Sequence, residues 1–246
     1  MSEVDLKLVL ATRNRGKISE IKGILSDLDI EILSAGDFES FPDPEETGKT
    51  FLENALIKAR AVYRKTQVTA LADDSGIEVD FLGGGPGVRS ARYGGEGLDD
   101  SERYIKLLEE LKGVPESERG ARFRCVMALY PLRGGSSGCG ENDFSEDILS
   151  HIEKIEEDRP EDPLKGGKEP PAGAFVTEGF LYGRISEKPA GESGFGYDPV
   201  FYIPEEGRTA AQMSRKEKNR ISHRYRALVE MKSLLQHCFG LKKRDL

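Results

Sequence analysis

The chain has 246 residues, a formal net charge of −8 and three cysteines that lie far apart. A chain of this length buries a substantial core without staples, and scattered cysteines in odd number make neither a zinc site nor a disulfide framework. The negative charge argues against a general nucleic-acid binder, which presents a basic surface. The N-terminus does not read as a signal peptide, and no apolar run approaches the ~20 residues of a membrane span. We therefore expect a cytoplasmic protein that binds neither nucleic acid nor membranes.

The first third of the chain predicts alternating strands and helices. Residues 6–11 are apolar enough for a buried strand, a polar turn follows, and apolar residues recur at helical spacing from near Lys17. Residues 30–33 form a second strand. After an acidic, proline-containing loop, Thr50 and Glu53 fit the capping box that opens a helix. This order of elements favours an α/β fold.

The next segment predicts two short strands, at residues 68–72 and 77–82, on either side of the sequence Asp-Asp-Ser-Gly at residues 73–76. A helix is predicted at residues 99–111, because Tyr and Leu side chains share one face there. The chain ends in a polar loop and a helix over about residues 222–238.

Residues 122–132 and 175–185 are predicted to be partner strands. Between them, residues 133–173 are first Gly/Ser-rich, then strongly acidic, then Lys/Gly/Pro-rich, with isoleucines for one short helix. This segment has too few apolar residues to fold alone. We expect a single domain over residues 1–246 with an insertion at about 133–173.

The first cluster of chemically useful residues lies where the first strand gives way to a helix. Backbone N–H groups at such a point face an anion, and the helix dipole favours negative charge. Lys17 adds a positive charge there, and Thr12 and Asn14 add short hydrogen-bonding groups. The segment does not match the Walker A pattern, and a plain turn with a capping residue is the alternative interpretation.

A second cluster consists of Glu45 and Glu46, which precede the capped helix with its Asn54 and Lys58. Paired acids before a helix are commonly solvated surface, and that interpretation stays open here.

Two adjacent aspartates, Asp73 and Asp74, form the third cluster, directly after a predicted buried strand. Ligand sites in α/β sheets gather at the ends of strands. Adjacent carboxylates repel unless a cation or hydrogen bonds relieve them, and Mg²⁺ prefers such hard oxygen ligands while keeping waters for a phosphate. The alternative is an Asp-rich β-turn closed by Gly76.

The fourth cluster combines two segments near the C-terminus. Residues 194–199 place Phe195 between two glycines, so that the backbone can approach a ligand closely and an aromatic ring can face a planar base. His223 and Arg224 follow Ser222, a predicted N-cap. Cations at a helix N-terminus oppose the dipole, so an anionic or carbonyl-bearing ligand would explain them; ordinary basic surface is the alternative.

Together these clusters resemble the inosine triphosphate pyrophosphatase family, also called the Ham1 or non-canonical purine NTP pyrophosphatase family. The matching motifs are S/T-x-N-x-x-K at residues 12–17, E-T-G-x-T-F…N-A…K-A at 46–59, D-D-S-G at 73–76, G-F-G-Y-D-P at 194–199 and S-H-R at 222–224. Their order and spacing agree over nearly the whole chain. The departure is the segment 133–173, where family members usually connect two strands briefly.

The resemblance implies a mixed, elongated central sheet flanked by helices, with two lobes and a cleft between them. It also implies a homodimer with one Mg²⁺-assisted site per subunit. Glu45 and Asp74 are the implied metal ligands, and Asp74 is also the implied proton acceptor. The implied substrate-binding residues are Thr12, Arg13, Asn14, Arg15, Gly16, Lys17, Ser75, Phe195, Gly196, Tyr197, Asp198, Lys218, His223 and Arg224.

The implied activity is Mg²⁺-dependent hydrolysis of ITP, dITP and XTP to monophosphate and pyrophosphate, which keeps these nucleotides out of DNA and RNA. Arg224, with five donors and a permanent charge, is the candidate reader of the purine 6-carbonyl, with phosphate binding as its alternative. Two rival functions are a phosphotransferase, which would need an acceptor pocket, and a non-catalytic nucleotide-binding module.

Overall fold

The computed structural model describes residues 6–130, 174–239 and 241. Its central element is a mixed seven-stranded sheet with the strand order β2-β1-β3-β4-β5-β6-β7. The parallel part joins β1 (Lys7–Leu10) to β2 (Glu31–Leu33) and to β3 (Ala70–Val79).

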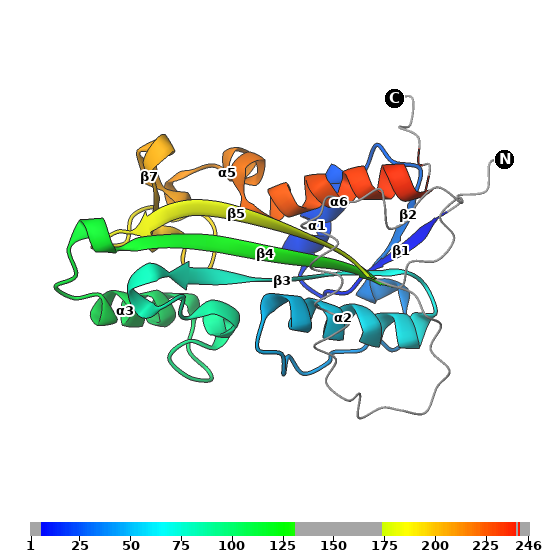
Figure 1. Cartoon of the computed structure of the whole chain (residues 1–246), viewed down its shortest axis with the longest axis horizontal. Helices are drawn as coiled ribbons and strands as arrows, with labels where there is room; N and C mark the ends of the chain where they lie inside the picture. Colours follow the sequence, from blue (N-terminus) through cyan, green and yellow to red (C-terminus); the bar gives the residue numbers. More distant parts are fainter. Residues whose placement is uncertain (1–5, 131–173, 240, 242–246) are drawn as a thin grey trace.

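The antiparallel part of the sheet gives the molecule its length. β3, β4 (Gly120–Tyr130) and β5 (Phe175–Ile185) pair along most of their residues, and the short strands β6 (Phe201–Ile203) and β7 (Arg208–Thr209) extend this part. Figure 1 shows the three long strands running through the elongated molecule. The paired strands predicted at 122–132 and 175–185 are thus confirmed within the described residues.

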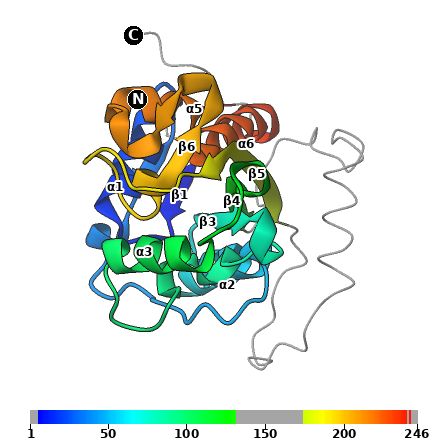
Figure 2. The same cartoon turned by 90° about the vertical axis from the view of Figure 1, so that its left-hand side faces the viewer.

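Helices cover both faces of the sheet, as Figures 1 and 2 show. α2 (Phe51–Thr66) packs on one face of β3 and β4, whereas α6 (His223–Phe239) packs on the opposite face, against β4 and β5, and contacts α1 (Arg15–Ile24). α3 (Asp100–Glu110) and α5 (Arg215–Ile221) lie toward the other end of the long strands.

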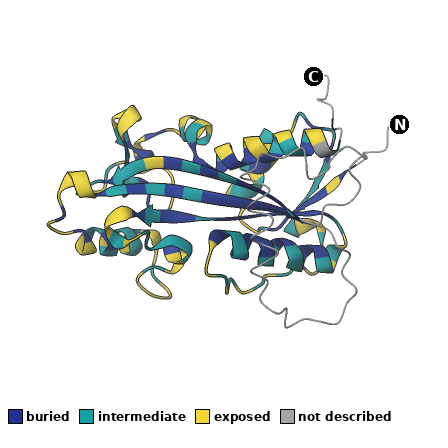
Figure 3. Cartoon of the chain, in the orientation of Figure 1, coloured by how far each residue is buried: buried dark blue, intermediate teal, exposed yellow. Residues whose placement is uncertain are grey.

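The two largest hydrophobic cores lie in different lobes of the molecule. One core joins β1, α1 and α6 and includes Leu8, Leu25 and Met231. The other joins α3, β6 and the far halves of β3 to β5 and includes Leu107 and Phe201. Figure 3 shows buried residues following the long strands through both lobes.

The structure contains a groove of about 480 Å³. It lies between α1, which belongs to the first core, and α5, which leads into α6. Its lining residues are Ser19, Glu20, Gly23, Ile24, Arg215, Lys216, Asn219, Arg220 and Tyr225. The expected mixed sheet with two lobes and an intervening cleft is confirmed.

Side-chain caps fix where the helices begin. Asn14 accepts hydrogen bonds from the backbone N–H groups of Gly16 and Lys17, so α1 begins at Arg15. The predicted capping box of Thr50 and Glu53 opens α2. Such caps satisfy backbone donors that the first helical turn leaves unpaired. Among the described helices, none has the length and apolar composition needed to cross a bilayer.

The prediction of two strands separated by a turn at residues 73–76 is wrong. β3 continues from Ala70 to Val79 and pairs with β4 through the Asp-Asp-Ser-Gly segment without a break. Gly76 serves close packing, not a turn: a Cβ there would lie 2.4 Å from Ser90 Oγ and 2.6 Å from Gly87 O. Pairing with β4 therefore overrides the turn preference of the segment.

The sequence also failed to predict α5, because its seven residues are too few and too polar to show an apolar stripe. Ser222 ends α5, and its hydroxyl accepts from the N–H of Tyr225, so it also opens α6 as predicted. The insertion predicted at about 133–173, with its suggested short helix, lies outside the described residues and stays a prediction.

Candidate active site

Asp73 and Asp74 are neighbours in a strand, so their side chains point to opposite faces of the sheet. Asp74 faces α2, whereas Asp73 faces α1 and α6. Both are buried, with 4% and 7% of their surfaces exposed for Asp73 and Asp74, respectively. The two carboxylates therefore do not share one cation, which was the sequence-based reason to place Mg²⁺ between them. Each has its own cationic partners.

On the α2 face, Asp74 is held by two side chains one helical turn apart. Lys58 Nζ lies 2.9 Å from Asp74 Oδ1, and Asn54 Nδ2 donates to Asp74 Oδ2 at 3.2 Å. Residues at i and i+4 share a helix face, so α2 presents both groups to the same carboxylate. Lys58 also binds Glu46 at 3.0 Å. One ammonium thus joins two carboxylates.

This environment raises the pKa of Asp74 above its usual value. Burial is the largest cause, and the negative charge of Glu46 acts in the same direction, whereas Lys58 and Asn54 lower the pKa of Asp74. A carboxylate whose pKa is raised toward the working pH is a better proton acceptor. Asp74 therefore has the electrostatics of a general base.

On the opposite face, Asp73 lies between two cations from distant parts of the chain. Its Oδ2 is 2.7 Å from Lys17 Nζ and 3.3 Å from Arg224 Nε. Burial alone would raise the pKa of Asp73, but Lys17 and Arg224 hold it well below its usual range. The Arg224 guanidinium also donates to Glu20 at 3.2 Å and to Ser75 Oγ at 3.2 Å.

These contacts bring together three of the predicted substrate-binding residues, Lys17, Ser75 and Arg224. Arg224 is only 4% exposed, and all three of its nitrogens have a partner. It is therefore a fixed cation in the sheet-facing wall of the site. Its predicted role as reader of the 6-carbonyl stays a prediction.

The predicted anion loop at residues 12–17 is built around Asn14. Asn14 Oδ1 accepts from the N–H groups of Gly16 at 2.9 Å and Lys17 at 3.2 Å, and Thr12 Oγ1 accepts from the N–H of Asn14. Arg13 donates to the carbonyl of Phe41 at 2.7 Å and lies over the Phe41 ring. Arg15 is exposed. Lys17 is thus the member of this loop whose side chain reaches Asp73.

The aromatic cluster is held in shape by Asp198. Asp198 is 1% exposed, forms an ion pair with Lys218 and accepts from the N–H of Phe195 at 3.0 Å. Gly194 has a φ of +86°, and a Cβ there would lie 2.1 Å from Asp198 Oδ2, so only glycine fits. The Phe195 ring is 61% exposed, with Lys218 Nζ 4.7 Å from its centroid.

The neighbours of Phe195 are tied to the α3 side of the site. The N–H of Gly196 donates to Asp100 at 2.7 Å, and the hydroxyl of Tyr197 donates to the carbonyl of Ser90 at 2.8 Å. This leaves the Phe195 face as the free planar surface of the loop, which is the arrangement that stacking on a base requires.

His223 is buried and has an unpaired ring nitrogen. Its ring stacks on Phe123 at 5.0 Å, and no described residue hydrogen-bonds its Nδ1. Burial, together with the nearby charges of Arg224 and Lys218, lowers the pKa of His223 well below its usual value, so the ring is neutral at pH 7. A buried polar atom without a partner is costly, and a ligand that pairs with it would remove that cost.

Two predicted metal ligands have different surroundings. Asp74 is buried among Lys58 and Asn54, whereas Glu45 is exposed, and its neighbour Glu46 is the acid linked to Asp74 through Lys58. Within the described ranges, no group of three or more His, Cys, Asp or Glu side chains could hold a metal ion. Mg²⁺ commonly takes only one or two protein carboxylates and keeps waters and substrate phosphates as its other ligands, so a site at Asp74 and Glu45 stays a prediction.

The sequence did not assign roles to Asn54, Lys58, Glu46, Glu20 and Asp73, although these residues hold the charged groups of the site. Asn54 and Lys58 carried a usable signal: two polar residues at i and i+4 border the apolar stripe of α2, and Asn54 is fully buried. Glu20 carried none, because its partner Arg224 is far away in the sequence. Asp73 stood out only as the neighbour of Asp74, and not as the partner of Lys17 and Arg224.

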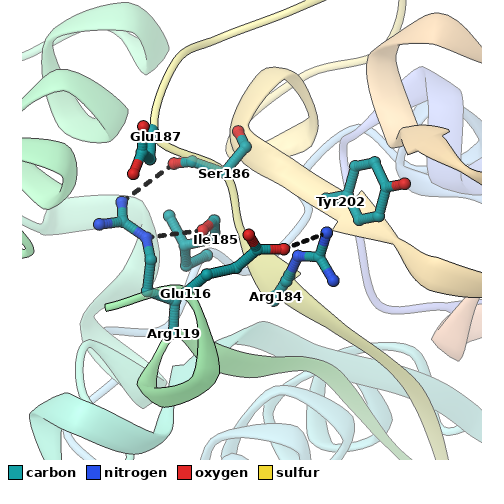
Figure 4. Close-up of a pocket in the computed structure, with 7 residues that line it drawn as sticks. All are labelled: Glu116, Arg119, Arg184, Ile185, Ser186, Glu187 and Tyr202. Atoms are coloured by element: carbon teal, nitrogen blue, oxygen red, sulfur yellow. Dashed lines mark hydrogen bonds and ion pairs between the residues drawn. The ribbon is translucent and has the colours of Figure 1, made fainter. Parts of the chain in front are cut away.

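A second cavity, of about 210 Å³, lies at the far end of the long strands and contains none of these residues. Figure 4 shows its lining. Arg119 donates to the carbonyls of Ile185 and Ser186, and Arg184 forms an ion pair with Glu116. Both arginines of the cavity thus have protein partners, and we assign the cavity a structural role.

Comparisons with known proteins identify the family of this chain. The Ham1 family model matches residues 8–144 and 168–234. The dITP/XTP pyrophosphatase of Geobacillus kaustophilus is 40% identical over 238 residues, covering 97% of this chain and 98% of that protein. The dITP/XTP pyrophosphatase of Escherichia coli strain K12 is 42% identical over 222 residues, covering 90% and 94%.

Solved structures show the same architecture. A HAM1 protein from Coxiella burnetii matches with a TM-score of 0.74 and 39% identity, over 94% of this chain and 98% of that one. The Ham1 protein of Staphylococcus aureus matches with a TM-score of 0.71 and 33% identity, over the same shares of the two chains. Family model, relatives and fold agree over nearly the full length of the sequence. The chain belongs to the Ham1 family.

Proposed function

We propose that the protein hydrolyses ITP, dITP and XTP to the nucleoside monophosphate and pyrophosphate. The observation that carries this proposal is the placement of Asp74 in β3. Asp74 is a buried carboxylate with a raised pKa and contacts Lys58 of α2, while its neighbour Asp73 in the same strand contacts Lys17. Relatives that the chain matches over most of their length are named dITP/XTP pyrophosphatases. Removal of such nucleotides before their incorporation into DNA and RNA is the cellular role that follows.

The proposed reaction needs a proton acceptor and several cations. A water oxygen attacks the α-phosphorus, the bond from that phosphorus to the bridging oxygen breaks, and its electron pair leaves with pyrophosphate. Asp74 accepts the proton of the attacking water. Lys17 and Lys58 lie on the two sides of β3 and offset the negative charge of the phosphates. Positioning and charge neutralisation dominate such reactions.

Mg²⁺ is the proposed cofactor, held by Asp74 and by Glu45 of the loop before α2. When bound, Mg²⁺ neutralises phosphate oxygens and lowers the pKa of water. Glu46 differs from Glu45 in that its carboxylate already binds Lys58 at 3.0 Å. Its proposed task is therefore to fix Lys58, which in turn holds Asp74.

The base end of the substrate is proposed to lie between Phe195 and His223. Phe195 is exposed and stacks on any purine. The unpaired Nδ1 of neutral His223 can donate to or accept from a base edge, depending on its tautomer. Lys218, fixed by Asp198 and lying over the Phe195 ring, adds a donor beside that position.

The decisive experiment incubates the protein with Mg²⁺ and a panel of nucleoside triphosphates and follows the products by phosphorus NMR. The proposal requires monophosphate and pyrophosphate from ITP, dITP and XTP without any acceptor. Stepwise release of orthophosphate through IDP contradicts it. A phosphotransferase would need a second substrate, and a binding module would bind nucleotide without turnover. Sedimentation of the same sample tests the proposed homodimer.

A further inference from the structure

The charged residues on the α6 face of β3 form one continuous chain of contacts. Lys17 binds Asp73, Asp73 binds Arg224, and Arg224 binds Glu20 and Ser75. Lys17 belongs to the first turn of α1 and Arg224 to the first turn of α6. Asp73 thus contacts both Lys17 at the proposed phosphate end and Arg224, the candidate reader of the base.

Both cations contact the same oxygen of Asp73. Lys17 Nζ is 2.7 Å and Arg224 Nε 3.3 Å from Oδ2, and the Asp73 and Arg224 side chains are 2% and 5% exposed. At this burial a charge needs a paired partner, because solvent does not screen it. Without the carboxylate, the two cations would repel each other.

The side chain of Asp73 lies on the other side of β3 from the proposed proton acceptor. Its neighbour Asp74 points to the other face, toward Lys58 and Asn54. An effect of Asp73 on turnover must therefore act through the cations that it places.

We infer that Asp73 is a positioning residue that sets Lys17 and Arg224 for nucleotide binding, whereas Asp74 serves the chemical step. This inference rests on the proposed function. It assigns different tasks to two adjacent, chemically identical side chains, and it predicts that their substitutions affect different kinetic constants.

The test compares Asp73→Asn with the wild-type full-length protein. Loss of a charge-assisted contact raises the KM for ITP by roughly 10- to 100-fold, while kcat changes by less than about threefold. In a Lys17→Met background the added effect of Asp73→Asn on KM shrinks, because the two residues act through one contact. A lower KM in Asp73→Asn, as expected if the carboxylate only competes with phosphate for Lys17, overturns the inference, as does a loss confined to kcat.

Glu78→Gln is the matched control. Glu78 lies in the same strand, its side chain is 13% exposed, and it pairs with Arg122 and Arg124 instead of with Lys17. The Glu78→Gln substitution removes a largely buried acid, so we expect it to lower Tm about as much as Asp73→Asn does. We expect it to leave the KM for ITP unchanged. If Asp73→Asn and Glu78→Gln raise KM equally, the effect is general destabilisation and the inference fails.

A binding measurement separates this inference from the proposed function. Inorganic tripolyphosphate is titrated calorimetrically into the wild-type protein and into Asp73→Asn. Weaker binding by Asp73→Asn, by roughly tenfold or more, supports the positioning role even if no triphosphate is hydrolysed. Absence of hydrolysis by the wild type would instead overturn the proposed function. Equal affinity of the two proteins for tripolyphosphate overturns the positioning role.

Discussion

At the scale of single residues, the site depends on where a strand places identical side chains. Asp73 and Asp74 differ only in the face that they occupy, yet the pKa of Asp73 is lowered by Lys17 and Arg224, while burial raises the pKa of Asp74. A carboxylate with a lowered pKa is a permanent charge that orders cations. One with a raised pKa can exchange a proton near working pH.

Asp74→Asn is predicted to abolish most of the turnover. The amide cannot accept a proton, and loss of a general base costs at least roughly 10²-fold in kcat. The side chain stays nearly isosteric, so circular dichroism and Tm should report a folded protein. ITP hydrolysis at saturating Mg²⁺ is the measurement, and near-normal kcat in the folded variant would remove Asp74 from the mechanism.

The pH dependence of kcat is predicted to respond to Lys58. Turnover needs ionised Asp74, so the rate falls as pH drops through the pKa of Asp74. Lys58 lowers that pKa. Lys58→Met removes the lowering charge, and the acidic limb of the pH–rate profile should move to higher pH. Lys65→Met, at an exposed position of the same helix, is the control and should leave the limb in place.

Glu45 and Glu46 are predicted to differ in their effect on the metal requirement. Glu45→Gln removes a proposed ligand, so more Mg²⁺ should be needed for half-maximal ITP hydrolysis. Glu46→Gln removes a partner of Lys58. Since Glu46 raises the pKa of Asp74, this variant should instead shift the acidic limb of the pH–rate profile to lower pH. Titrations of activity against Mg²⁺ for both variants decide; an equal shift in both would contradict the assignment of Glu45.

At the scale of elements, the sequence predicted the long apolar strands, the capped helices and the residues that gather around β3. Periodicity and caps are local signals, and both were sufficient for α1, α2 and β5. The prediction from sequence failed at residues 73–76, where the local composition favours a turn and only pairing with β4 reveals a strand. That one error also hid the opposite orientations of Asp73 and Asp74.

Gly76 is predicted to tolerate no side chain. A Cβ would lie 2.6 Å from the backbone oxygen of Gly87, which cannot move as a flexible side chain could. Overpacking of this kind costs about 1–3 kcal/mol, so Gly76→Ala should lower the free energy of unfolding by that amount in urea denaturation. Gly23→Ala in α1 is the control: nothing lies within 4 Å of its Cβ, and it should stabilise the protein by about 0.4–1 kcal/mol. Equal stability of both variants would contradict the packing argument.

At the scale of the whole molecule, two cores joined by three long strands place the functional groups between the lobes. α1 and α6 belong to the first core, and the Phe195 loop packs with the second through Tyr197. The strands give the sheet rigidity across both lobes, while the groove between α1 and α5 remains open on one side.

The insertion at about residues 133–173 is predicted to be dispensable for chemistry. The strands that flank it are already paired next to the excursion, with Leu129 opposite Phe175 and Ala128 opposite Val176. Their ends therefore lie close enough for a short Gly-containing turn to connect them, as in an ordinary hairpin. Among the described residues, the charged partners of Asp73 and Asp74 are Lys17, Lys58 and Arg224, which lie outside the replaced segment. Because closure entropy grows slowly with loop length, the shortened chain should be at least as stable as the full chain. Replacement of the segment should leave kcat and KM for ITP near their original values. A folded, shortened protein that loses most of its activity would show that the segment contributes to the site.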